Sequence, residues 1–442
     1  MIKKLSLDSK LTSLFFKMSN AFFIKTGSAG LSFLMFVLLA RVMGQQSYGI
    51  FAAAFSSATF LAVCGGFGQQ TLIHRFGGLY IAKGKQNLLI GVIKNGYLLV
   101  TFGCFFISFI YFLWATLNFG NPNINLIIGT CFLAVSIGLV EYQARVAILI
   151  SNVSVALIPR DIIWRLIIVI LTSIAIFSNK TTIFASNWIW ILAFTLFAIL
   201  FFQIHWMRSN GDQKIFFTKS EKYDRPVWLR AMWGLWFVAI ITRSTGALSV
   251  VIAENMLGPN SAAPYFAALR TSQLLTLFQI AATIIVTPMI SREIGNNNEA
   301  AVKKICSFVA CISGGAALIG LLLFYLLGSN ILNLFGIGFD VAIVPMLILS
   351  CGYAASCLLG PIQPLLQMKG HDRSLLIMLV FSNGISLAIM PLAIRYGGIE
   401  GASLALVLGL SGWSILGWIY SRKILRIDPS IFGILRVFRF FR

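Results

Sequence analysis

The stretch Leu38-Leu39-Ala40-Arg41-Val42-Met43-Gly44-Gln45-Gln46-Ser47-Tyr48-Gly49-Ile50-Phe51 joins two long apolar runs, at residues 24–39 and 50–67. Each run is close to the roughly 20 residues that an α-helix needs to cross a bilayer. The joint is short, and Gly44 and Gly49 suit it to a sharp turn between antiparallel helices. The stretch therefore predicts a helical hairpin that crosses a membrane twice.

A weaker copy of this joint recurs near the middle of the chain. There Ala253-Glu254-Asn255-Met256-Leu257-Gly258-Pro259-Asn260-Ser261 leads, two residues longer, into Tyr265-Phe266-Ala267-Ala268. A joint that recurs after about half the chain indicates an internal duplication, an architecture common among membrane transporters.

The composition is that of a membrane protein. Of the 442 residues, 58% are hydrophobic and only 11% are charged, against about 25% charged in soluble proteins. The net charge of +21 does not indicate nucleic-acid binding, because the basic residues lie at the ends of apolar runs rather than on one soluble face. They suit an anionic cytoplasmic leaflet instead. The seven cysteines and three histidines lack metal-ligand spacing, so no metal or other cofactor is expected.

Apolar runs long enough to cross a membrane occur along the whole chain, six on each side of a central polar break. They lie near residues 22–40, 48–67, 88–115, 124–150, 161–177, 186–206, 229–253, 264–290, 305–328, 341–368, 374–395 and 399–421. The pattern predicts an all-α integral membrane protein with about twelve transmembrane helices in two six-helix lobes.

Basic residues fix the expected orientation, because alternate connections carry nearly all of them. One set of connections includes the N-terminus, the central break and the C-terminus, whereas the other holds only Arg41, Lys180 and Arg395. By the positive-inside rule both termini are cytoplasmic. The expected parts are an interfacial segment (1–21), a first lobe (22–207), a cytoplasmic linker (208–228), a second lobe (229–421) and a basic amphipathic tail (422–442).

A charge inside an apolar run costs roughly 2.5–3.5 kcal/mol at mid-depth, so each one needs a reason. The basic residues that stand out are Lys25, Arg243 and Arg270, in the first or second run of a half. Because guanidinium binds phosphate in a bidentate manner, these residues predict a positive cavity for an anionic cargo, a phosphate or diphosphate. Polar residues on neighbouring turns extend the expected cavity lining: Ser28, Ser32, Gln273, Gln279, Gln363 and Gln367.

Several of these residues have a second interpretation. Lys25 lies close enough to the boundary for its stem to reach the headgroups, and the Ser and Gln side chains suit hydrogen bonds between helices equally well. Glu141 and Arg145 are four residues apart on one helix face, as either a structural pair or an ion-coupling pair.

The opening stretch itself is expected at the external surface, away from the cytoplasmic side. Arg41 would end its helix there, where the helix C-terminus favours its charge. Gly44, Tyr48 and Gly49 would shape the outer turn and an external gate.

Two short motifs carry a family resemblance. Leu39-Ala40-Arg41-Val42-Met43-Gly44 with Tyr48-Gly49-Ile50-Phe51, and then Gly65-Gly66-Phe67-Gly68 with Arg75, resemble the first helices of the Wzx-type O-antigen and exopolysaccharide flippases. These are polysaccharide biosynthesis proteins of the multidrug/oligosaccharidyl-lipid/polysaccharide (MOP) superfamily, which includes the MATE transporters. Length, span number and cytoplasmic termini agree with that family over the whole chain.

The resemblance implies two lobes around a central cavity in the bacterial cytoplasmic (inner) membrane. It implies alternating-access transfer of undecaprenyl-diphosphate-linked oligosaccharide repeat units from the inner to the outer leaflet, for O-antigen, capsule or exopolysaccharide assembly. It also implies a polysaccharide polymerase and a chain-length regulator as partners. Family cavities are rich in basic residues from the helices that hold Lys25, Arg243 and Arg270.

Other functions stay open at this stage. A cation-coupled small-molecule exporter would need an intramembrane acid, and Glu141 is the acid found within a run. A polysaccharide polymerase or ligase would need a sizeable external loop, whereas the expected external connections are short. A peptidoglycan-precursor flippase and a structural scaffold are further alternatives.

Overall fold

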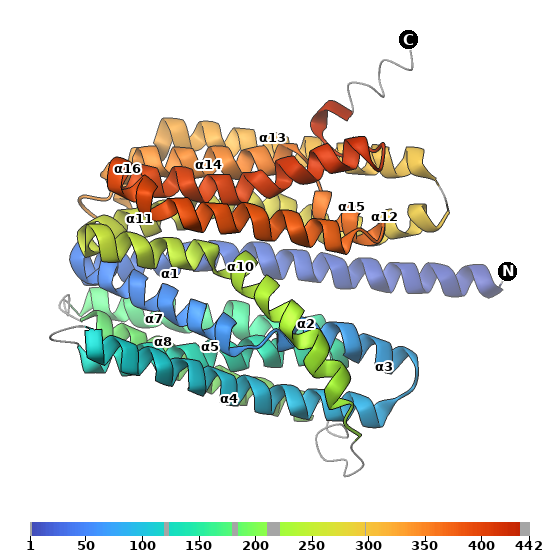
Figure 1. Ribbon diagram of the computed structural model, residues 1–442, viewed down its shortest axis with the longest axis horizontal. Helices are drawn as coiled ribbons and strands as arrows, with labels where there is room; N and C mark the ends of the chain where they lie inside the picture. The colour runs from blue at the N-terminus through green and yellow to red at the C-terminus, as the bar shows by residue number, and fades with distance from the viewer. Residues whose placement is uncertain (1, 119–122, 179–183, 210–221, 297, 434–442) are drawn as a thin grey trace. The chain divides into compact units, whose positions relative to one another are not determined.

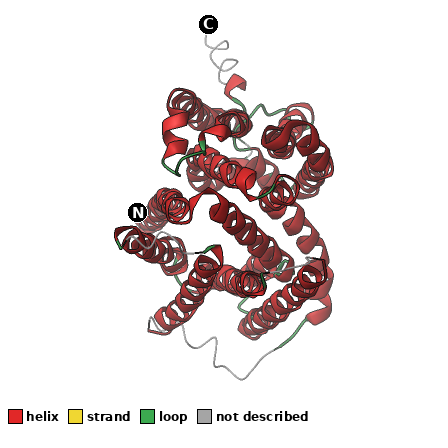
Figure 2. Ribbon diagram, turned by 90° about the vertical axis from the view of Figure 1, so that its left-hand side faces the viewer, coloured by secondary structure: helices red, strands yellow, loops and turns green. Residues whose placement is uncertain are grey.

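The computed structural model describes residues 2–118, 123–178, 184–209, 222–296 and 298–433. Side chains of residues 2–22 are not among those described, and the expected linker and tail lie partly outside the described residues, at 210–221 and 434–442. Nearly all described residues are helical, and none of them forms a β-strand (Figure 2).

The first half of the chain runs from α1 to α8 (Figure 1). Its elements are α1 (Ile2–Gly65), α2 (Gln69–Leu72), the π-helix η1 (Ile73–Gly77), α3 (Gly78–Ala82), α4 (Gln86–Asn118), α5 (Ile124–Ile150), α6 (Val153–Leu157), the π-helix η2 (Ile158–Ile163), α7 (Trp164–Phe177) and α8 (Ala185–Ser209).

The second half runs from α10 to α16 (Figure 1). Its elements are α10 (Arg225–Leu257), α11 (Pro259–Ser272), the 3₁₀-helix η3 (Gln273–Thr276), α12 (Leu277–Gly295), α13 (Glu299–Asn333), the 3₁₀-helix η4 (Asp340–Ala342), α14 (Ile343–Leu358), α15 (Ile362–Met368) and α16 (Asp372–Lys423).

The two joints that resemble each other in sequence also share a backbone conformation. Gly44 has φ 71° and ψ 171°, and Gly258 has φ 81° and ψ 170°. This region of backbone space is open almost only to glycine. The agreement supports the internal duplication, and it explains why a glycine stands at each joint.

Eight segments of the described chain are long and apolar enough to cross a membrane. Two of them contain a non-helical glycine, Gly44 or Gly398, so each of these two holds a pair of helices. Two further continuous helical stretches, α6–η2–α7 and α11–η3–α12, are interrupted by a π turn and a 3₁₀ turn. The described residues thus form twelve long helical segments, and the all-α membrane fold is confirmed.

The chain divides into two compact units. The N-terminal unit is Leu34–Val251, and the C-terminal unit comprises the chain up to Phe33 and from Ile252 onward. In the C-terminal unit, Phe33 packs edge-to-face on Phe335. Most of α10 belongs to the N-terminal unit, where the Trp236 indole donates to the carbonyl of Cys64 at 2.7 Å.

The tail begins as a folded extension of the C-terminal unit. Ile427 is fully buried in a core with Val286 and Cys306. Asp428 accepts hydrogen bonds from Trp418 and from the hydroxyl of Ser430. The segment after α16 is therefore anchored before the described residues end at position 433.

The hinge glycines give a stability prediction. Gly258→Ala or Gly44→Ala should destabilise the protein by about 1–3 kcal/mol, because alanine rarely adopts this backbone conformation, although a Cβ there would meet no atom within 4 Å. Gly246→Ala is the matched control, since this glycine lies inside α10 with equally open surroundings, and alanine favours a helix. Thermal unfolding of the purified variants in detergent measures both effects. An equal melting temperature for Gly258→Ala and Gly246→Ala would contradict the account.

Candidate functional site

The site is built around a break in the helical chain after α1. Phe67 and Gly68 both have positive φ, 42° and 66°, and α2 begins directly after them. The aromatic ring of Phe67 lies 5.2 Å from that of Trp236 on α10. A Cβ at Gly68 would come within 2.8 Å of the Trp236 backbone nitrogen, so glycine permits this close approach. The break is thereby fixed against α10, within the N-terminal unit.

Arg243 contacts the first turn after the break. Its Nη1 donates to Oε1 of the buried Gln70 at 2.8 Å. Arg243 itself is exposed, although it lies near the middle of the apolar helix α10. A guanidinium at membrane depth faces a water-filled cavity or the bundle interior rather than lipid. This face of α10 is therefore suited to a polar, hydrated region.

His74 lies one turn after Gln70, in the π-helix η1. Its Nε2 is 3.4 Å from Nη1 of Arg145 on α5. Because a guanidinium can only donate, Nε2 acts as the acceptor, and the imidazole is neutral with its proton on Nδ1. Burial lowers the pKa of His74, and the nearby charges of Arg145 and Arg243 lower it further. The segment Gln69–Ala82 lies outside the candidate membrane spans.

The ion pair that Glu141 forms in the structure is with a different arginine from the expected Arg145, although Glu141 still attracts the Arg145 charge. Glu141 forms its ion pair with Arg160, at 2.6 Å. The π turn of η2, which contains Pro159, presents Arg160 to α5, and this partner from another helix takes the carboxylate. The four-residue spacing indicates that Glu141 and Arg145 lie on one helix face. It cannot show that Arg160, from another segment, reaches the Glu141 carboxylate.

The second carboxylate of the region is also occupied. Asp161 is almost fully buried and lies 3.4 Å from Nε of Arg160 and 3.6 Å from Nη1 of Arg165. In this region the described residues thus include four arginines and two carboxylates, and both carboxylates are paired with arginines. Arg145 and Arg243 form no direct ion pair with a carboxylate among the described residues, although Glu141 and Asp161 lie near enough to Arg145 to attract its charge. We call Gln70, His74, Arg145 and Arg243 the arginine site.

Two members of the arginine site were missed by sequence reasoning. Neither Gln70 nor His74 is among the residues that the sequence singles out, and of the four members only Arg243 is expected from the sequence to bind the cargo. A signal was present in Gly65-Gly66-Phe67-Gly68, because glycines that end an apolar helix before polar residues often mark a broken helix at a binding site. The π-helices, which are frequent at functional sites, leave no comparable pattern in a single sequence.

In the C-terminal unit, Arg270 lies at the end of α11, directly before the 3₁₀ turn η3. Its Nη1 donates to Oε1 of Gln273 at 3.2 Å. Its guanidinium carbon lies 4.7 Å from the ring centre of Phe266. Arg270 is only partly exposed. It therefore keeps a positive charge beside a local change of helix type.

The other polar residues expected to line a cavity have different environments. Gln279 donates to the Ser356 carbonyl on α14 at 3.3 Å, which is the interhelical bond considered as the alternative. Ser28 is buried and donates to the Lys25 carbonyl in its own helix at 2.9 Å. Gln363 and Gln367 are exposed on α15, whereas Ser32 and Lys25 are half-buried.

The three basic residues expected to act together fall in different units. Lys25 and Arg270 belong to the C-terminal unit, and Arg243 belongs to the N-terminal unit. The structure brings Arg243 together with Gln70, and Arg270 together with Gln273. A joint role for all three residues stays a prediction.

The hinge residues have a structural environment. Tyr48 is fully buried, and its ring stacks on Phe51 with centroids 5.9 Å apart. Arg41 is exposed at the end of the helix before Gly44. An external gate at this position stays a prediction.

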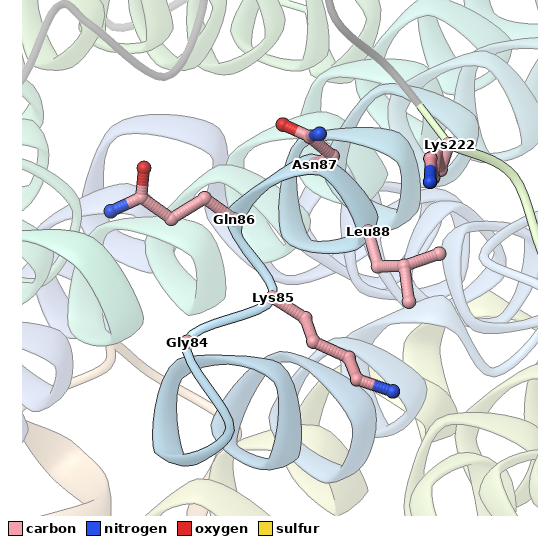
Figure 3. Close-up of a pocket in the computed structure, with 6 residues that line it drawn as sticks. All are labelled: Gly84, Lys85, Gln86, Asn87, Leu88 and Lys222. Carbon is pink, nitrogen blue, oxygen red and sulfur yellow. The ribbon is translucent and has the colours of Figure 1, made fainter.

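A separate basic pocket lies at the start of α4. It has a volume of about 460 Å³ and is lined by Gly84, Lys85, Gln86, Asn87, Leu88 and Lys222 (Figure 3). Figure 3 shows the Lys85 and Lys222 side chains on either side of Leu88. The Lys222 backbone N–H donates to the Asn87 carbonyl at 3.2 Å, so the end of the central linker is tied to α4. Across the described residues no cluster of His, Cys, Asp or Glu is arranged to hold a metal ion.

Comparison with known proteins identifies the fold. No protein-family model matches the sequence. No curated protein is similar enough in sequence to be matched. Among solved structures, the inward-facing form of a multidrug resistance MATE family transporter of the MOP superfamily superposes with a TM-score of 0.69 at 13% identity, covering 89% of this chain and 94% of that chain.

Two further structures agree with this match. The outward-facing form of a multidrug resistance MATE family transporter has a TM-score of 0.64 at 13% identity and covers 92% and 94% of the two chains. A MOP superfamily transporter from Pyrococcus furiosus, described by the reverse polarity of its binding pocket, has a TM-score of 0.62 at 12% identity and covers 92% and 94%. The chain therefore has the multi-pass helical fold of the MATE transporters of the MOP superfamily.

Proposed function

We propose that this protein moves an anionic amphiphile across the membrane, namely an oligosaccharide linked through a diphosphate to a polyprenol such as undecaprenol. Transfer would run from the inner to the outer leaflet, as in the flippases that its sequence motifs resemble. The observation that carries the proposal is the surplus of guanidinium groups around α5 and η2 in the N-terminal unit, where the carboxylates of Glu141 and Asp161 are both paired with arginines.

The chemistry of the arginine site favours phosphate over other cargoes. Arg145 and Arg243 make hydrogen bonds to neutral partners, an imidazole nitrogen and an amide oxygen. A guanidinium has five N–H donors in a planar fork that matches phosphate geometry. A diphosphate would add negative charge and a bidentate geometry that the neutral imidazole and amide lack, so it would replace these partners favourably.

Basic groups of the C-terminal unit extend the proposal. Arg270 and Lys25 would supply further positive charge to the diphosphate, while exposed polar side chains such as Gln363 would meet the sugars. The basic pocket formed with Lys85 and Lys222 would suit anionic lipid headgroups at the expected cytoplasmic surface.

The likeness to MATE transporters also supports a second candidate, a cation-coupled exporter of small molecules. Solved structures of this fold include multidrug resistance transporters. Such a mechanism would need a carboxylate that is free to bind a cation. In the N-terminal unit Glu141 and Asp161 are each held by arginine, which leaves the half-buried Glu254 near the end of α10 as the acid that this candidate would use. The reversed pocket polarity described for the Pyrococcus furiosus relative is a precedent for a different cargo on this fold.

The biological setting follows from the cargo. The membrane would be the bacterial inner membrane, and the product would feed O-antigen, capsule or exopolysaccharide assembly. A polysaccharide polymerase and a chain-length regulator would act on the flipped unit. The protein would serve as a transporter and not as an enzyme.

Removing one guanidinium should impair transport directly. Arg243→Gln and Arg270→Ala should each lower surface polysaccharide at least tenfold in a complementation assay, because a hydrogen bond to a charged group contributes about 1.5–3 kcal/mol. Membrane expression, followed by immunoblot, should stay normal.

The matched control for these variants is Arg395→Gln. Arg395 is an exposed arginine in α16, just before the non-helical Gly398. Its loss should leave the amount of surface polysaccharide unchanged. Normal polysaccharide in Arg243→Gln and Arg270→Ala would remove both residues from the proposed site.

The ion pair between Glu141 and Arg160 separates the two candidate functions. Glu141→Gln should reduce transport activity, because Arg160 then keeps only one of its two carboxylate partners. The loss of that partner should destabilise the site by roughly 1–3 kcal/mol. The double variant Glu141→Gln with Arg160→Gln should recover most of the activity, since no unpaired charge then remains at this pair. If Glu141 instead bound a coupling cation, transport would be lost in both the single and the double variant. A double variant as inactive as Glu141→Gln alone would therefore favour the exporter.

A further inference from the structure

We propose that Gln70, His74, Arg145 and Arg243 form an anion-binding site that takes up a proton on His74 when the anion binds. The inference rests on the proposed function only for the identity of the anion. It assigns a coupled proton to a transport site that has no free carboxylate among its described neighbours.

The geometry places two arginines against one short helical segment. Gln70 and His74 are four residues apart on the continuous α2–η1 helix, a spacing that brings side chains to one face. Arg243 reaches this segment from α10 at 2.8 Å, and Arg145 reaches it from α5 at 3.4 Å. Arginines from two other helices, α10 and α5, thus reach the α2–η1 segment within the N-terminal unit.

The donors of the site are incompletely used. Nε of Arg145 is buried and makes no hydrogen bond within the described residues. Its Nη1 contacts only the neutral imidazole, at a distance longer than an ideal hydrogen bond. A buried donor without an acceptor is costly, and an anion is the ligand that supplies acceptors and charge together.

The surroundings of His74 favour its neutral form. Burial lowers its pKa, and the positive charges of Arg145 and Arg243 lower it further. An anion between the two guanidinium groups would cancel part of their field. The pKa of His74 would then rise, and the protonated ring would donate to the anion from Nε2, where it now accepts from Arg145.

Arg145 and Arg243 are the charged groups near η1 that lower the pKa of His74. The helices packed on η1 are α2, α3, α4 and α5. Their titratable side chains near this level are Tyr80 on α3, Lys94 and Tyr97 on α4, and Glu141 and Arg145 on α5, while η1 itself carries Arg75. The charges that act on His74 are those of Arg145 and Arg243, and Glu141 is held by Arg160.

The change in the pKa of His74 determines how anion binding depends on pH. In the free site the pKa of His74 is low, and in the occupied site it is higher, so binding takes up a proton and affinity increases as pH falls. The effect is confined to the window between the two pKa values, because outside it both forms carry the same number of protons. One linked proton changes the affinity by up to about tenfold per pH unit.

Calorimetric titration of the purified full-length protein tests the site. The probes are sulfate and a soluble farnesyl diphosphoryl sugar, both of which are fully ionised at neutral pH, so any proton taken up enters the protein. Titrations near pH 6.5–7.5, about the ordinary pKa of histidine, are run in two buffers of different ionisation enthalpy. The wild-type protein should bind both probes and take up between a fraction and about one proton per anion.

His74→Gln keeps a polar side chain but cannot titrate, so it should bind within a few-fold of wild type and take up no proton. His205→Gln, at an exposed histidine on α8, should behave as wild type. Unchanged uptake in His74→Gln, or binding without uptake in wild type, would overturn the proton linkage. Failure to bind either probe would overturn the site. Sulfate binding with proton uptake but no binding of the diphosphoryl sugar would support the linked site and contradict the proposed function instead.

Discussion

A guanidinium group inside an apolar helical protein needs water, a carboxylate or a hydrogen-bond acceptor, and this requirement governs the interior of the N-terminal unit. Its carboxylates, Glu141 and Asp161, are taken by Arg160 and Arg165. Arg145 and Arg243 are left with the neutral acceptors His74 and Gln70. Because a guanidinium inside an apolar helix is expensive, these two arginines are the groups on which the proposed anion site rests.

Irregular backbone creates the geometry that this site requires. The glycine break before α2 positions Gln70, and the π-helices η1 and η2 carry His74 and Arg160. Irregular helical segments of this kind are frequent at functional sites. The 3₁₀ turn after Arg270 has a similar place in the C-terminal unit. Each unit therefore holds an arginine next to a change of helix type.

The fold was largely predictable from the sequence, and the site was predictable only in part. Apolar runs of about 20 residues and the repeated glycine joint indicate the helices and the duplication, since both depend on local composition. Arg243 and Arg270 could be selected because a charge inside an apolar run is rare. The partner of Glu141 could not be predicted, because Arg160 lies in the π-helix η2 of another segment, and sequence spacing does not show that it reaches Glu141. The division into units was equally hidden, as it depends on packing between distant segments such as Phe33 with Phe335.

The central claim is that the cargo is an anionic, diphosphate-linked glycolipid, and transport in reconstituted vesicles tests it most directly. Purified protein would be placed in liposomes that contain a fluorescent polyprenyl diphosphoryl oligosaccharide, and a membrane-impermeant quencher would report its movement between leaflets. A lipophilic cationic dye, measured in parallel, represents the cargo of a multidrug exporter. The account predicts protein-dependent movement of the diphosphoryl oligosaccharide, lost in Arg243→Gln, and no protein-dependent movement of the dye. Transport of the cationic dye without movement of the glycolipid would contradict it.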